Sequence, residues 1–497
     1  MAFSAAAARS SARAGCCWAD QDLNPTFPPL DGTLVCDTVV VGGGIVGLTA
    51  ALSLCDAGRQ TIVLESRRIG TQVTGRSTAK VTAQHGLIYR YLSDHAGPDI
   101  AELYARANTF AMDRIRTWID AFYIGCDYEK KDAYCYIIDP QRKPDLQDEA
   151  DAARQVGLTA TMLDRAPLPF QTAGAVCFPD QGQFNPTLYL EGLAAAIVAR
   201  GGKIREESPA ISFDHDGRWR VSTPRGAVRA DHVIMATNMP VKSPLGYSSR
   251  TQPRMHVAMA FRPAESVAID GMFIGIEEPT HSIRVGRDAG GPLLLVLGPR
   301  FNTGQDADVM RRFLDLESWA RSHLPVGESI WRWCNEDYDT VDRRPYVGQP
   351  DAKKAPGFYV ATGFNGWGIT NGTAAGLAMA AEISAGKRLW GDLYDPLRPV
   401  PQDFHQSGDT QSLIGKPSEL AIGQGGVLKQ GDEAIALYRK EDGELTILSA
   451  ACTHKGCTVT WNNADGTWDC PCHGSIFDKD GHVIHGPARR PLSPRGL

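Results

Sequence analysis

The sequence has no excess of positive charge and no long apolar run. Its 497 residues include 51 Lys and Arg against 57 Asp and Glu, which gives a formal net charge of -6, and no run of Lys and Arg appears. Proteins that bind nucleic acid or an acidic membrane surface usually carry basic clusters. No uninterrupted apolar stretch reaches the roughly 20 residues that cross a bilayer. We therefore expect a soluble, cytoplasmic protein with no nucleic-acid partner and no transmembrane segment.

The N-terminus lacks the hydrophobic core of a secretory signal peptide. Its first 19 residues, MAFSAAAARSSARAGCCWA, contain Arg9 and Arg13 and no acidic residue. A start rich in Ala, Ser and Arg without acids is typical of an organelle transit peptide. The same composition fits a disordered bacterial N-terminus, which we favour. Residues 1–35 are therefore predicted to be an N-terminal extension, with organelle targeting as the alternative.

Cysteine is too scarce for a disulfide-stabilised scaffold, because a chain of this length contains only 12. Eight of them, including the Cys16–Cys17 pair, are dispersed and are expected to be buried apolar residues or free thiols. The other four lie close together near the C-terminus and are Cys452, Cys457, Cys470 and Cys472. This clustering predicts a local site rather than a network of disulfides.

The rest of the chain divides into three parts. In residues 36–390, β-branched runs such as DTVVVG and HVIMAT alternate with helical windows rich in Ala and Leu, which is typical of an α/β domain. Residues 391–417 are rich in Pro and polar residues, which indicates a linker. Residues 418–497 contain short strands separated by Gly-Asp, Asp-Gly and Asn-Asn turns, which indicates a small all-β domain.

The α/β domain begins with a dinucleotide-binding pattern. In DTVVVGGGIVGLTAALSLCDAGRQTIVLE, a strand, a Gly-rich turn, a helix and a second strand follow one another. Gly42, Gly44 and Gly47 allow a tight turn, close approach of a pyrophosphate and close packing of helix on strand. The helix N-terminus faces the phosphates, and Glu65 ends the second strand where a ribose hydroxyl is bound. The spacing does not distinguish FAD from NAD. The same site is assigned Ile45, Val46 and Ser66.

The C-terminal cysteine cluster contains two short Cys/His loops. Cys452-Thr-His454 and Cys470-Pro-Cys472-His473 give the pattern C-x-H…C-x-x-H. Two Cys on one iron and two His on the other are the ligands of a Rieske [2Fe–2S] centre. Zinc is the alternative, but Cys470 and Cys472 are closer in sequence than the C-x(2–4)-C pairs of zinc sites. The pattern therefore favours a [2Fe–2S] cluster.

Residues 420–492 resemble Rieske proteins. The resemblance implies that Cys452 and Cys470 hold one iron, that the two histidines hold the outer iron, and that Cys457 and Cys472 form a disulfide between the two loops. All four cluster ligands and both disulfide partners are present in this sequence.

The resemblance also bears on the reduction potential of the cluster. Ser475 stands where a hydroxyl donates to a cluster sulfur, whereas Phe477 replaces a tyrosine that donates a second hydrogen bond. With one bond missing, we expect a potential high in the Rieske range of roughly −150 to +300 mV but below its top. His482 and His485 follow the pattern and are expected to be ordinary strand residues.

The larger domain resembles the D-amino-acid-oxidase/glycine-oxidase family of FAD enzymes over about residues 36–388. TGRSTAKVTAQHG (74–86) is similar to the family's segment from the ribityl chain to the flavin ring, and VIMATN (233–238) to its returning strand. DRRPYVG (342–348) and GFYVATGFNGWGITNGTAAG (357–376) are similar to its closing flavin motif. The resemblance implies that the cofactor is FAD.

The family resemblance also predicts the architecture. It implies a Rossmann-like α/β FAD-binding domain with an antiparallel-sheet substrate subdomain inserted at roughly 87–170 and 246–330, followed here by the all-β Rieske domain. Further FAD contacts are expected from Arg76, Ser77, Thr78, Ala79, Ala210, Thr237, Gly363, Asn365, Gly366, Trp367, Gly368, Ile369 and Thr370.

The sequence has no second Gly-rich strand–turn–helix unit, which flavin enzymes that use NAD(P)H usually carry. Electrons are therefore expected from an organic substrate, and the family resemblance implies an amine or amino-acid-like compound oxidised at a C–N bond by hydride transfer. Since a Rieske centre takes one electron at a time, we expect a relay through it to an external one-electron acceptor protein or quinone. The alternatives are reverse flow, in a reductase or monooxygenase, and a redox sensor or electron-carrier module without a small substrate. The linker is compatible with a mobile or a fixed Rieske domain.

One segment indicates the class of substrate. WCNEDYDTVDRRPYVG (333–348) aligns with a family segment in which an arginine often binds the substrate carboxylate. Asp337 occupies that position, with Glu336 beside it, which disfavours a simple α-amino acid and favours a cationic amine. The alternative is that both are solvated loop or helix-capping charges. An acid could be bound elsewhere by Arg254, Arg284, Arg300 or Arg332.

In addition to Asp337, three residues are catalytic candidates. Lys80 is expected to contact flavin N5 or the ring carbonyls. His85 is expected to hydrogen-bond or pack near the ring, with covalent attachment of the flavin as the alternative. Trp367 is expected to form a wall of the flavin pocket, with a plain core position as the alternative.

Overall fold

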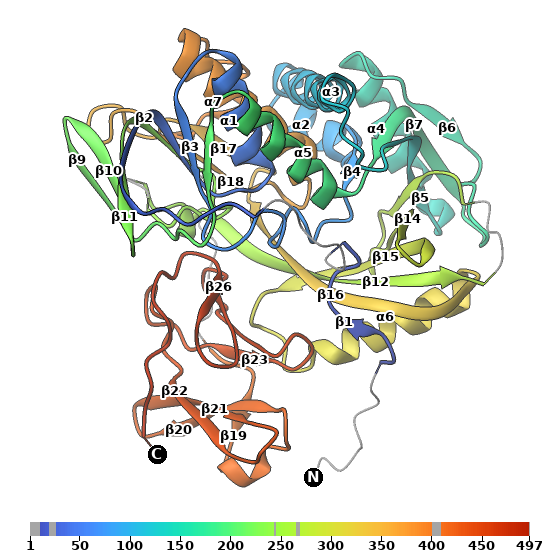
Figure 1. Ribbon diagram of the computed structural model, residues 1–497. Coiled ribbons are helices and arrows are strands. Elements are labelled where there is room, and N and C mark those ends of the chain that lie inside the picture. The colour runs from blue at the N-terminus through green and yellow to red at the C-terminus, as the bar shows by residue number, and fades with distance from the viewer. Residues whose placement is uncertain (1–9, 19–25, 243–244, 265–268, 400–408, 497) are drawn as a thin grey trace.

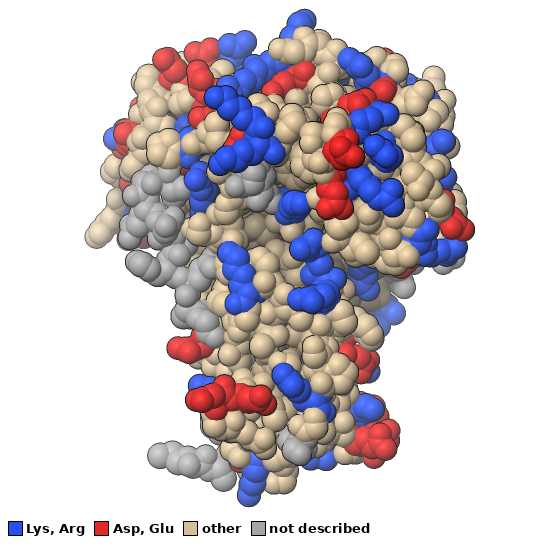
Figure 2. Space-filling view, turned by 90° about the vertical axis from the view of Figure 1, so that its left-hand side faces the viewer, with Lys and Arg blue, Asp and Glu red and all other residues tan. Residues whose placement is uncertain are grey.

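The computed structural model describes residues 10–18, 26–242, 245–264, 269–399 and 409–496. A large body contains two extended sheets, and a smaller β domain formed by the C-terminal residues lies beneath it (Figure 1). The small domain is narrower than the large body, and Lys and Arg side chains lie near where the two meet on the face that Figure 2 shows. Among the described residues, no helix combines the length and apolar character needed to cross a bilayer.

The nucleotide-binding part is built on a largely parallel sheet in the order β17-β18-β11-β2-β3-β8. The β-branched run of β2 is buried on both faces, which a parallel sheet covered on both sides requires. Helices α1, α5 and α7 cover one face, and the β9–β10 hairpin extends from β11. The bounds are β2 (Gly32–Val41), α1 (Ile45–Asp56), β3 (Thr61–Leu64), α5 (Pro186–Ala199), β8 (Lys203–Arg205), β9 (Ser212–Asp216), β10 (Arg218–Thr223), β11 (Gly226–Met235), β17 (Tyr346–Gly348), β18 (Phe358–Thr362) and α7 (Gly368–Ala385).

The second sheet has ten strands and is largely antiparallel, with the order β1-β16-β12-β15-β14-β13-β5-β7-β4 and β6 attached to β7. Helix α6 covers one of its faces (Figure 1). The bounds are β4 (Lys80–Val81), α2 (Ile88–His95), α3 (Pro98–Ala121), β5 (Glu129–Ile137), η1 (Pro140–Arg142), α4 (Lys143–Gln155), β6 (Thr161–Leu163), β7 (Gly174–Gln183), η2 (Tyr247–Ser249), β12 (Thr251–Pro263), β13 (Met272–Gly275), β14 (Ser282–Asp288), β15 (Gly291–Asn302), α6 (Val309–His323) and β16 (Val326–Thr340).

Part of the N-terminal extension is folded onto this second sheet. Strand β1 (Arg13–Ala14) pairs in parallel with β16. Trp18 is 1% exposed, and its Nε1 donates to the Ser77 carbonyl at 2.8 Å. The preference for a disordered N-terminus is therefore wrong for residues 10–18, because their apolar side chains complete a core on the sheet. Residues 1–9 and 19–25 lie outside the described residues.

Replacing Trp18 should destabilise the large body. Trp18→Ala removes a buried indole and its hydrogen bond, and we expect the free energy of unfolding to fall by about 3–5 kcal/mol. Arg13→Ala is the control, because Arg13 is exposed and stacks on the Trp331 ring with its guanidinium carbon 4.2 Å from the centroid; its loss should cost about 1 kcal/mol or less. Urea denaturation followed by circular dichroism measures the free energy of unfolding of both variants. If both lose about 1 kcal/mol or less, the burial of Trp18 does not stabilise the large body.

The C-terminal domain consists of two four-stranded sheets, in the orders β19-β20-β21-β22 and β23-β24-β25-β26. Strand β19 pairs with β20, so this domain begins within the stretch expected to be linker. The bounds are β19 (Leu413–Ile414), η3 (Pro417–Glu419), β20 (Gly425–Gln430), β21 (Glu433–Arg439), β22 (Leu445–Ser449), β23 (Thr460–Asn462), β24 (Thr467–Asp469), β25 (Ile476–Phe477) and β26 (Val483–His485).

The first half of the predicted linker is packed on the large body. It contains helix α8 (Gly391–Tyr394), whose last two residues are buried. The buried Arg398 is paired with Asp342 at 2.6 Å and lies over the Tyr346 ring at 3.6 Å. Residues 400–408 lie outside the described residues. The linker is therefore shorter than its composition suggested.

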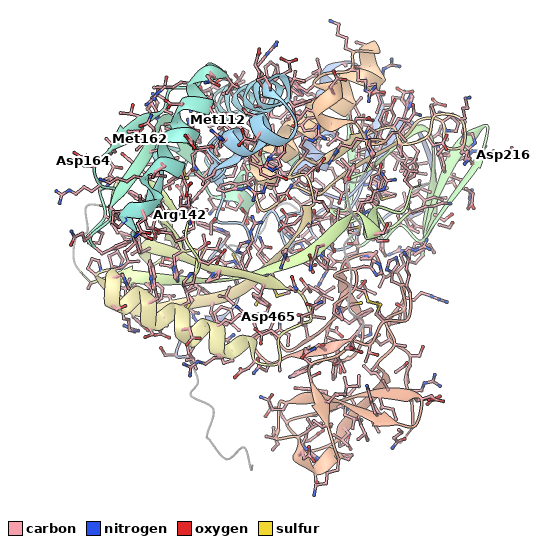
Figure 3. All side chains as sticks on the ribbon, turned by 180° about the vertical axis from the view of Figure 1, so that it is seen from behind. Met112, Arg142, Met162, Asp164, Asp216 and Asp465 are labelled. Carbon is pink, nitrogen blue, oxygen red and sulfur yellow. A yellow bond between two sulfur atoms is a disulfide. The ribbon has the colours of Figure 1, made fainter. Side chains whose placement is uncertain are left out.

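The small domain contacts the large body through many polar interactions. Asp465, labelled in Figure 3, lies at this junction and is 3.5 Å from the Arg76 guanidinium. Further contacts join Arg332 to the Ala464 carbonyl (2.8 Å), Asn463 to Asp308 (2.8 Å), Lys455 to Ser248 (3.1 Å), Arg489 to the Ile211 carbonyl (2.9 Å) and Tyr338 to the His473 carbonyl (3.2 Å). In this structure the small domain is docked on the large body.

Candidate functional site

A cavity of about 440 Å³ lies at the carboxyl end of β2, between the two sheets and the small domain. This volume is in the range of cofactor sites. Fourteen of the predicted cofactor residues line it, and they are Gly42, Gly44, Ile45, Val46, Glu65, Ser66, Arg76, Ser77, Thr78, Ala210, Thr237, Gly366, Gly368 and Ile369. The other six predicted residues are not among the lining residues, and they are Gly47, Ala79, Gly363, Asn365, Trp367 and Thr370.

One end of the cavity has the features of a dinucleotide site. Gly42 has φ +112°, and a Cβ on Gly47 would overlap the Gly42 carbonyl oxygen, so both positions require glycine. Helix α1 starts after Gly44, which supplies no side-chain cap, and Ile45 N donates to Thr74 Oγ1 at 3.2 Å. The N–H groups of Val46 and Gly47 remain for a phosphate. Glu65 lines the cavity and accepts from Gly43 N at 2.7 Å and Arg67 N at 2.9 Å, while burial raises its pKa. These residues fit the pyrophosphate and ribose of FAD.

The other end of the cavity is polar and lies against β12 and β16. Asp337 lines it and accepts from Gly366 N at 2.6 Å; burial raises the pKa of its carboxyl to about 6. Both Asp337 and Glu336 are buried within β16, so the alternative of solvated charges is wrong. Asn335 and His256 also line this end, and burial lowers the pKa of His256 to about 3.

His256 was not predicted from the sequence, because its place in the cavity depends on how two strands pair. It lies on β12 opposite Asn335 of β16 and therefore faces the same side of the sheet. Once two strands are paired, this register places both residues in the cavity, but the pairing is not evident from a single sequence.

The four arginines considered as acid-binding groups are all engaged elsewhere. Arg300 pairs with Asp339 at 2.9 Å and donates to the Asn365 carbonyl. Arg254 lies 3.7 Å from Asp339 and donates to Asn302. The remaining two donate to backbone carbonyls, Arg284 to Thr78 and Ala79 and Arg332 to Ala464. None of the four is among the residues that line the cavity.

Lys80, His85 and Trp367 are not among the residues that line the cavity. Lys80 Nζ donates to the Phe273 carbonyl at 2.8 Å and to Ser282 Oγ at 2.6 Å, and burial lowers its pKa to about 7. His85 stacks on Trp367 with ring centroids 4.5 Å apart. A catalytic role for these three residues stays a prediction.

Both ring nitrogens of His85 are occupied by protein groups. Nδ1 lies 2.5 Å from the Tyr104 hydroxyl, and Nε2 lies 2.8 Å from the Thr82 carbonyl. A covalent bond to flavin would break one of these buried contacts. We therefore expect acid precipitation to leave the yellow FAD in the supernatant; a yellow pellet whose flavin disappears in His85→Ala would contradict this.

The four predicted cluster ligands converge in the small domain. The Cys452 and Cys470 thiols are buried and interact, and this contact lowers the pKa of Cys452 to about 6. The rings of His454 and His473 lie 4.7 Å apart at 89°. His454 Nδ1 is buried without a hydrogen-bond partner among the described residues. Two facing thiols and an unpaired imidazole nitrogen fit a [2Fe–2S] cluster.

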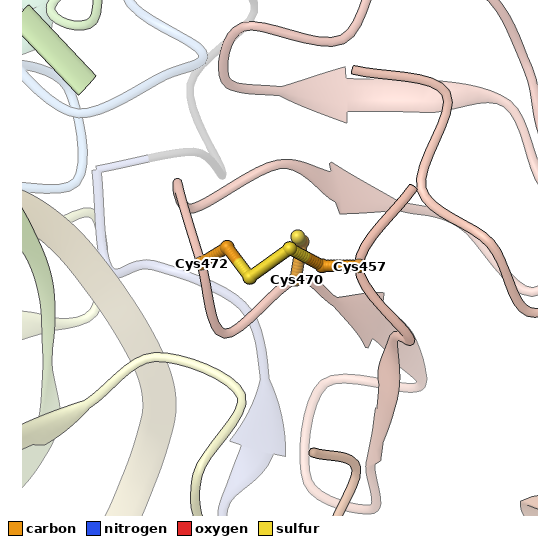
Figure 4. Close-up of side chains that lie close together, drawn as sticks. All are labelled: Cys457, Cys470 and Cys472. Atoms are coloured by element: carbon orange, nitrogen blue, oxygen red, sulfur yellow. A yellow bond between two sulfur atoms is a disulfide. The ribbon is translucent and has the colours of Figure 1, made fainter. Parts of the chain in front are cut away.

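Residues around the cluster site agree with the Rieske resemblance. Cys457 and Cys472 form a disulfide, with Cα atoms 6.4 Å apart. The Cys470 sulfur lies within 4.8 Å of both (Figure 4). Ser475 is fully buried, and its hydroxyl interacts with the Cys452 thiol. Phe477 is also fully buried, in the core of the domain.

The small domain also forms one wall of the cavity, which the sequence did not suggest. His482 and His485 line it, and His485 Nε2 lies 3.4 Å from Glu336 Oε2. His485 lies in strand β26 (Val483–His485) as expected, but it is not an ordinary strand residue, because it completes a buried interface between the domains. His482 precedes the strand. Burial lowers the pKa of His485 to about 4 and raises that of Glu336 well above its usual range.

Known proteins match both parts of the chain. The family model of FAD-dependent oxidoreductases named DAO matches residues 37–382, and the Rieske [2Fe-2S] domain model matches residues 410–494. The Bacillus subtilis protein YhfW, named as a Rieske 2Fe-2S iron-sulfur protein, is 30% identical over 496 residues and covers 96% of each chain.

Two further similarities concern the large body. Gamma-glutamylputrescine oxidoreductase of Escherichia coli is 26% identical over 366 residues, which cover 71% of this chain and 85% of that protein. The crystal structure of L-proline dehydrogenase from P. horikoshii has a TM-score of 0.62 at 19% identity, covers 74% of this chain and 98% of that chain, and supports the fold.

These matches confirm the expected fold class and the two expected cofactors, FAD and a [2Fe–2S] cluster. The chain belongs to the DAO family of FAD-dependent oxidoreductases, is an enzyme of the amine and amino-acid oxidase type, and carries a C-terminal Rieske [2Fe–2S] domain.

Proposed function

We propose that this enzyme oxidises the C–N bond of a cationic amine and passes the electrons through its Rieske centre to an external one-electron acceptor, a protein or a quinone. When bound, FAD accepts two electrons as a hydride, whereas a Rieske cluster accepts one at a time. The observation that carries the proposal is the position of the small domain, which forms a wall of the FAD cavity while holding the cluster ligands.

A short chain of bonds supports electron transfer between the two sites. The Tyr338 hydroxyl donates to the carbonyl of the cluster ligand His473 at 3.2 Å. The residue before it, Asp337, lines the cavity and accepts from Gly366 N at 2.6 Å. One tyrosine and its neighbour thus connect the cluster loop to the closing flavin motif.

Charge at the polar end of the cavity supports a cationic substrate. With a pKa of about 6, Asp337 is ionised at neutral pH, and the four arginines considered for an acid are engaged elsewhere. A buried carboxylate attracts an ammonium group and repels a substrate carboxylate. The name of the Escherichia coli relative, which refers to a putrescine derivative, supports the same substrate class.

The remaining polar groups at this end have roles in orientation. His256 is neutral at physiological pH, because burial lowers its pKa to about 3, and Asn335 is held by its hydrogen bond to the Val73 carbonyl at 3.2 Å. Both can fix the amine without a competing charge. Hydride transfer gains mainly from such orientation and from exclusion of water.

Anaerobic spectroscopy with a panel of substrates tests the proposal. We expect di- and polyamines to bleach the flavin band and then to reduce the cluster, while simple α-amino acids act poorly. Reduction only by a ferredoxin-type donor would overturn the proposed direction and favour reverse flow. No response to any small molecule would favour the redox sensor.

A further inference from the structure

The FAD cavity is not confined to the FAD-binding domain. Eight residues of the Rieske domain line it, all within residues 482–491, and they are His482, Val483, Ile484, His485, Gly486, Ala488, Arg489 and Pro491. We call residues 482–491 the closing segment. It comprises β26 and the loop that follows it.

We propose that the closing segment is part of the FAD-binding site, that Arg489 contacts the adenine-side half of the cofactor, and that FAD is retained only when the Rieske domain is docked. The inference concerns cofactor binding and does not depend on the identity of the substrate or the direction of electron flow.

Arg489 lies at the dinucleotide end of the cavity. Its Nη1 donates to the Ile211 carbonyl at 2.9 Å, and Ile211 lines the cavity next to Ala210. The same stretch is tied to the ribose-binding position, because Ser208 N donates to the Glu65 carbonyl at 2.8 Å. Arg489 therefore lies on the side of the cavity expected to hold the ribose and adenine.

Most N–H donors of the Arg489 guanidinium have no hydrogen-bond acceptor among the described residues. An arginine has five N–H donors, and among the described residues only the bond to Ile211 uses them. Arg489 is exposed and lines the cavity, so the remaining donors are available to a phosphate or an adenine nitrogen. A planar guanidinium suits both, because it binds phosphate through paired hydrogen bonds and stacks on aromatic rings.

The other end of the closing segment reaches the flavin end of the cavity. His485 lies beside Glu336, the neighbour of Asp337, with its Nε2 3.4 Å from Glu336 Oε2. Both residues line the cavity, and their side chains are at most 10% exposed. The segment thus extends along the cavity from its flavin end to its adenine end.

The closing segment is fixed to the loop that holds the cluster. Ala488 N donates to Ser475 Oγ at 3.1 Å. Gly486 has φ +93°, and a Cβ there would overlap the Gly474 carbonyl oxygen. Because Gly474 and Ser475 follow the ligand His473, the packing that orders the cluster loop also orders the wall of the FAD site.

A charge reversal with a matched control tests this inference in the full-length protein. Arg489→Glu places a carboxylate in the cavity wall, and we expect the Kd for FAD, measured by quenching of flavin fluorescence on reconstitution, to rise at least about tenfold. Arg490→Glu makes the same change of net charge at an exposed neighbour that does not line the cavity, and it should bind FAD like the wild type. The Rieske EPR signal reports that the domain is folded in both variants.

Each outcome decides the proposal. Weak FAD binding in Arg489→Glu alone, with the EPR signal intact, supports it. Wild-type Kd values in both variants, or equal weakening in both, overturn it, since the effect would then be absent or a general effect of charge. If Arg489→Glu loses the EPR signal, Arg489→Met is tested instead, because methionine keeps an apolar stem without the charge. An unchanged Kd for FAD in Arg489→Met overturns the proposal.

Discussion

Replacing His473 with alanine is expected to abolish the Rieske EPR signal while substrate still reduces the flavin. His473 is one of four cluster ligands, and its side chain lies in the small domain outside the FAD cavity. Turnover with a one-electron acceptor should fall by roughly a hundredfold or more, since even residues that only support metal ligands cost tenfold to a hundredfold. EPR, anaerobic flavin bleaching and steady-state turnover measure the three quantities.

Lys479→Ala is the control for this variant. Lys479 is an exposed residue of the same domain and should leave all three measurements unchanged. If folded, FAD-loaded His473→Ala protein also fails to reduce its flavin with substrate, the cluster does not lie downstream of the flavin. Unchanged turnover would show that electrons leave the flavin by another route.

Asp337→Asn is expected to lower kcat/KM for a cationic amine by about a hundredfold, which corresponds to about 2.7 kcal/mol. The substitution keeps the shape of the side chain and its hydrogen bond from Gly366 N but removes the buried charge. Asp337→Glu keeps the charge and should recover part of the loss. Steady-state kinetics with an amine and with an uncharged analogue separate the charge effect from a structural one.

The same carboxyl sets an expected pH dependence. Burial raises the pKa of Asp337 to about 6, so the group is protonated and neutral below that pH. Since only the ionised form attracts the ammonium group, kcat/KM should rise as pH increases through about 6. This step should be absent in Asp337→Asn. If Asp337→Asn keeps both the wild-type kcat/KM and the rise of kcat/KM through about pH 6, Asp337 does not bind the substrate.

The features predicted correctly from the sequence are those set by local chemistry. The glycines before α1, the acid at the end of β3 and the Cys/His loops require particular residue types at fixed spacing, because backbone conformation and metal ligation depend on near neighbours. A single sequence therefore carries them, and Gly42 and Glu65 line the cavity. The disulfide of Cys457, which the Rieske resemblance implied, is also present.

The features that were missed depend on contacts between distant segments. Trp18 is buried only because it meets the second sheet, and His485 lines the FAD cavity only because the Rieske domain docks there. A long, polar side chain such as that of Lys80 could extend toward the flavin or donate to the Phe273 carbonyl, as it does here. The residues near Lys80 in the sequence do not determine which of the two contacts forms. Packing geometry decides in each case, and spacing along the chain does not encode it.

The most direct test of the account is the rate at which the cluster is reduced after the flavin. Anaerobic enzyme is mixed with a reducing amine, and flavin absorbance and the EPR signal of the frozen samples are followed in time. We predict that cluster reduction follows flavin reduction at a rate independent of enzyme concentration, because both sites lie within one docked chain. A rate proportional to enzyme concentration, or a cluster that stays oxidised beside a reduced flavin, would contradict the account.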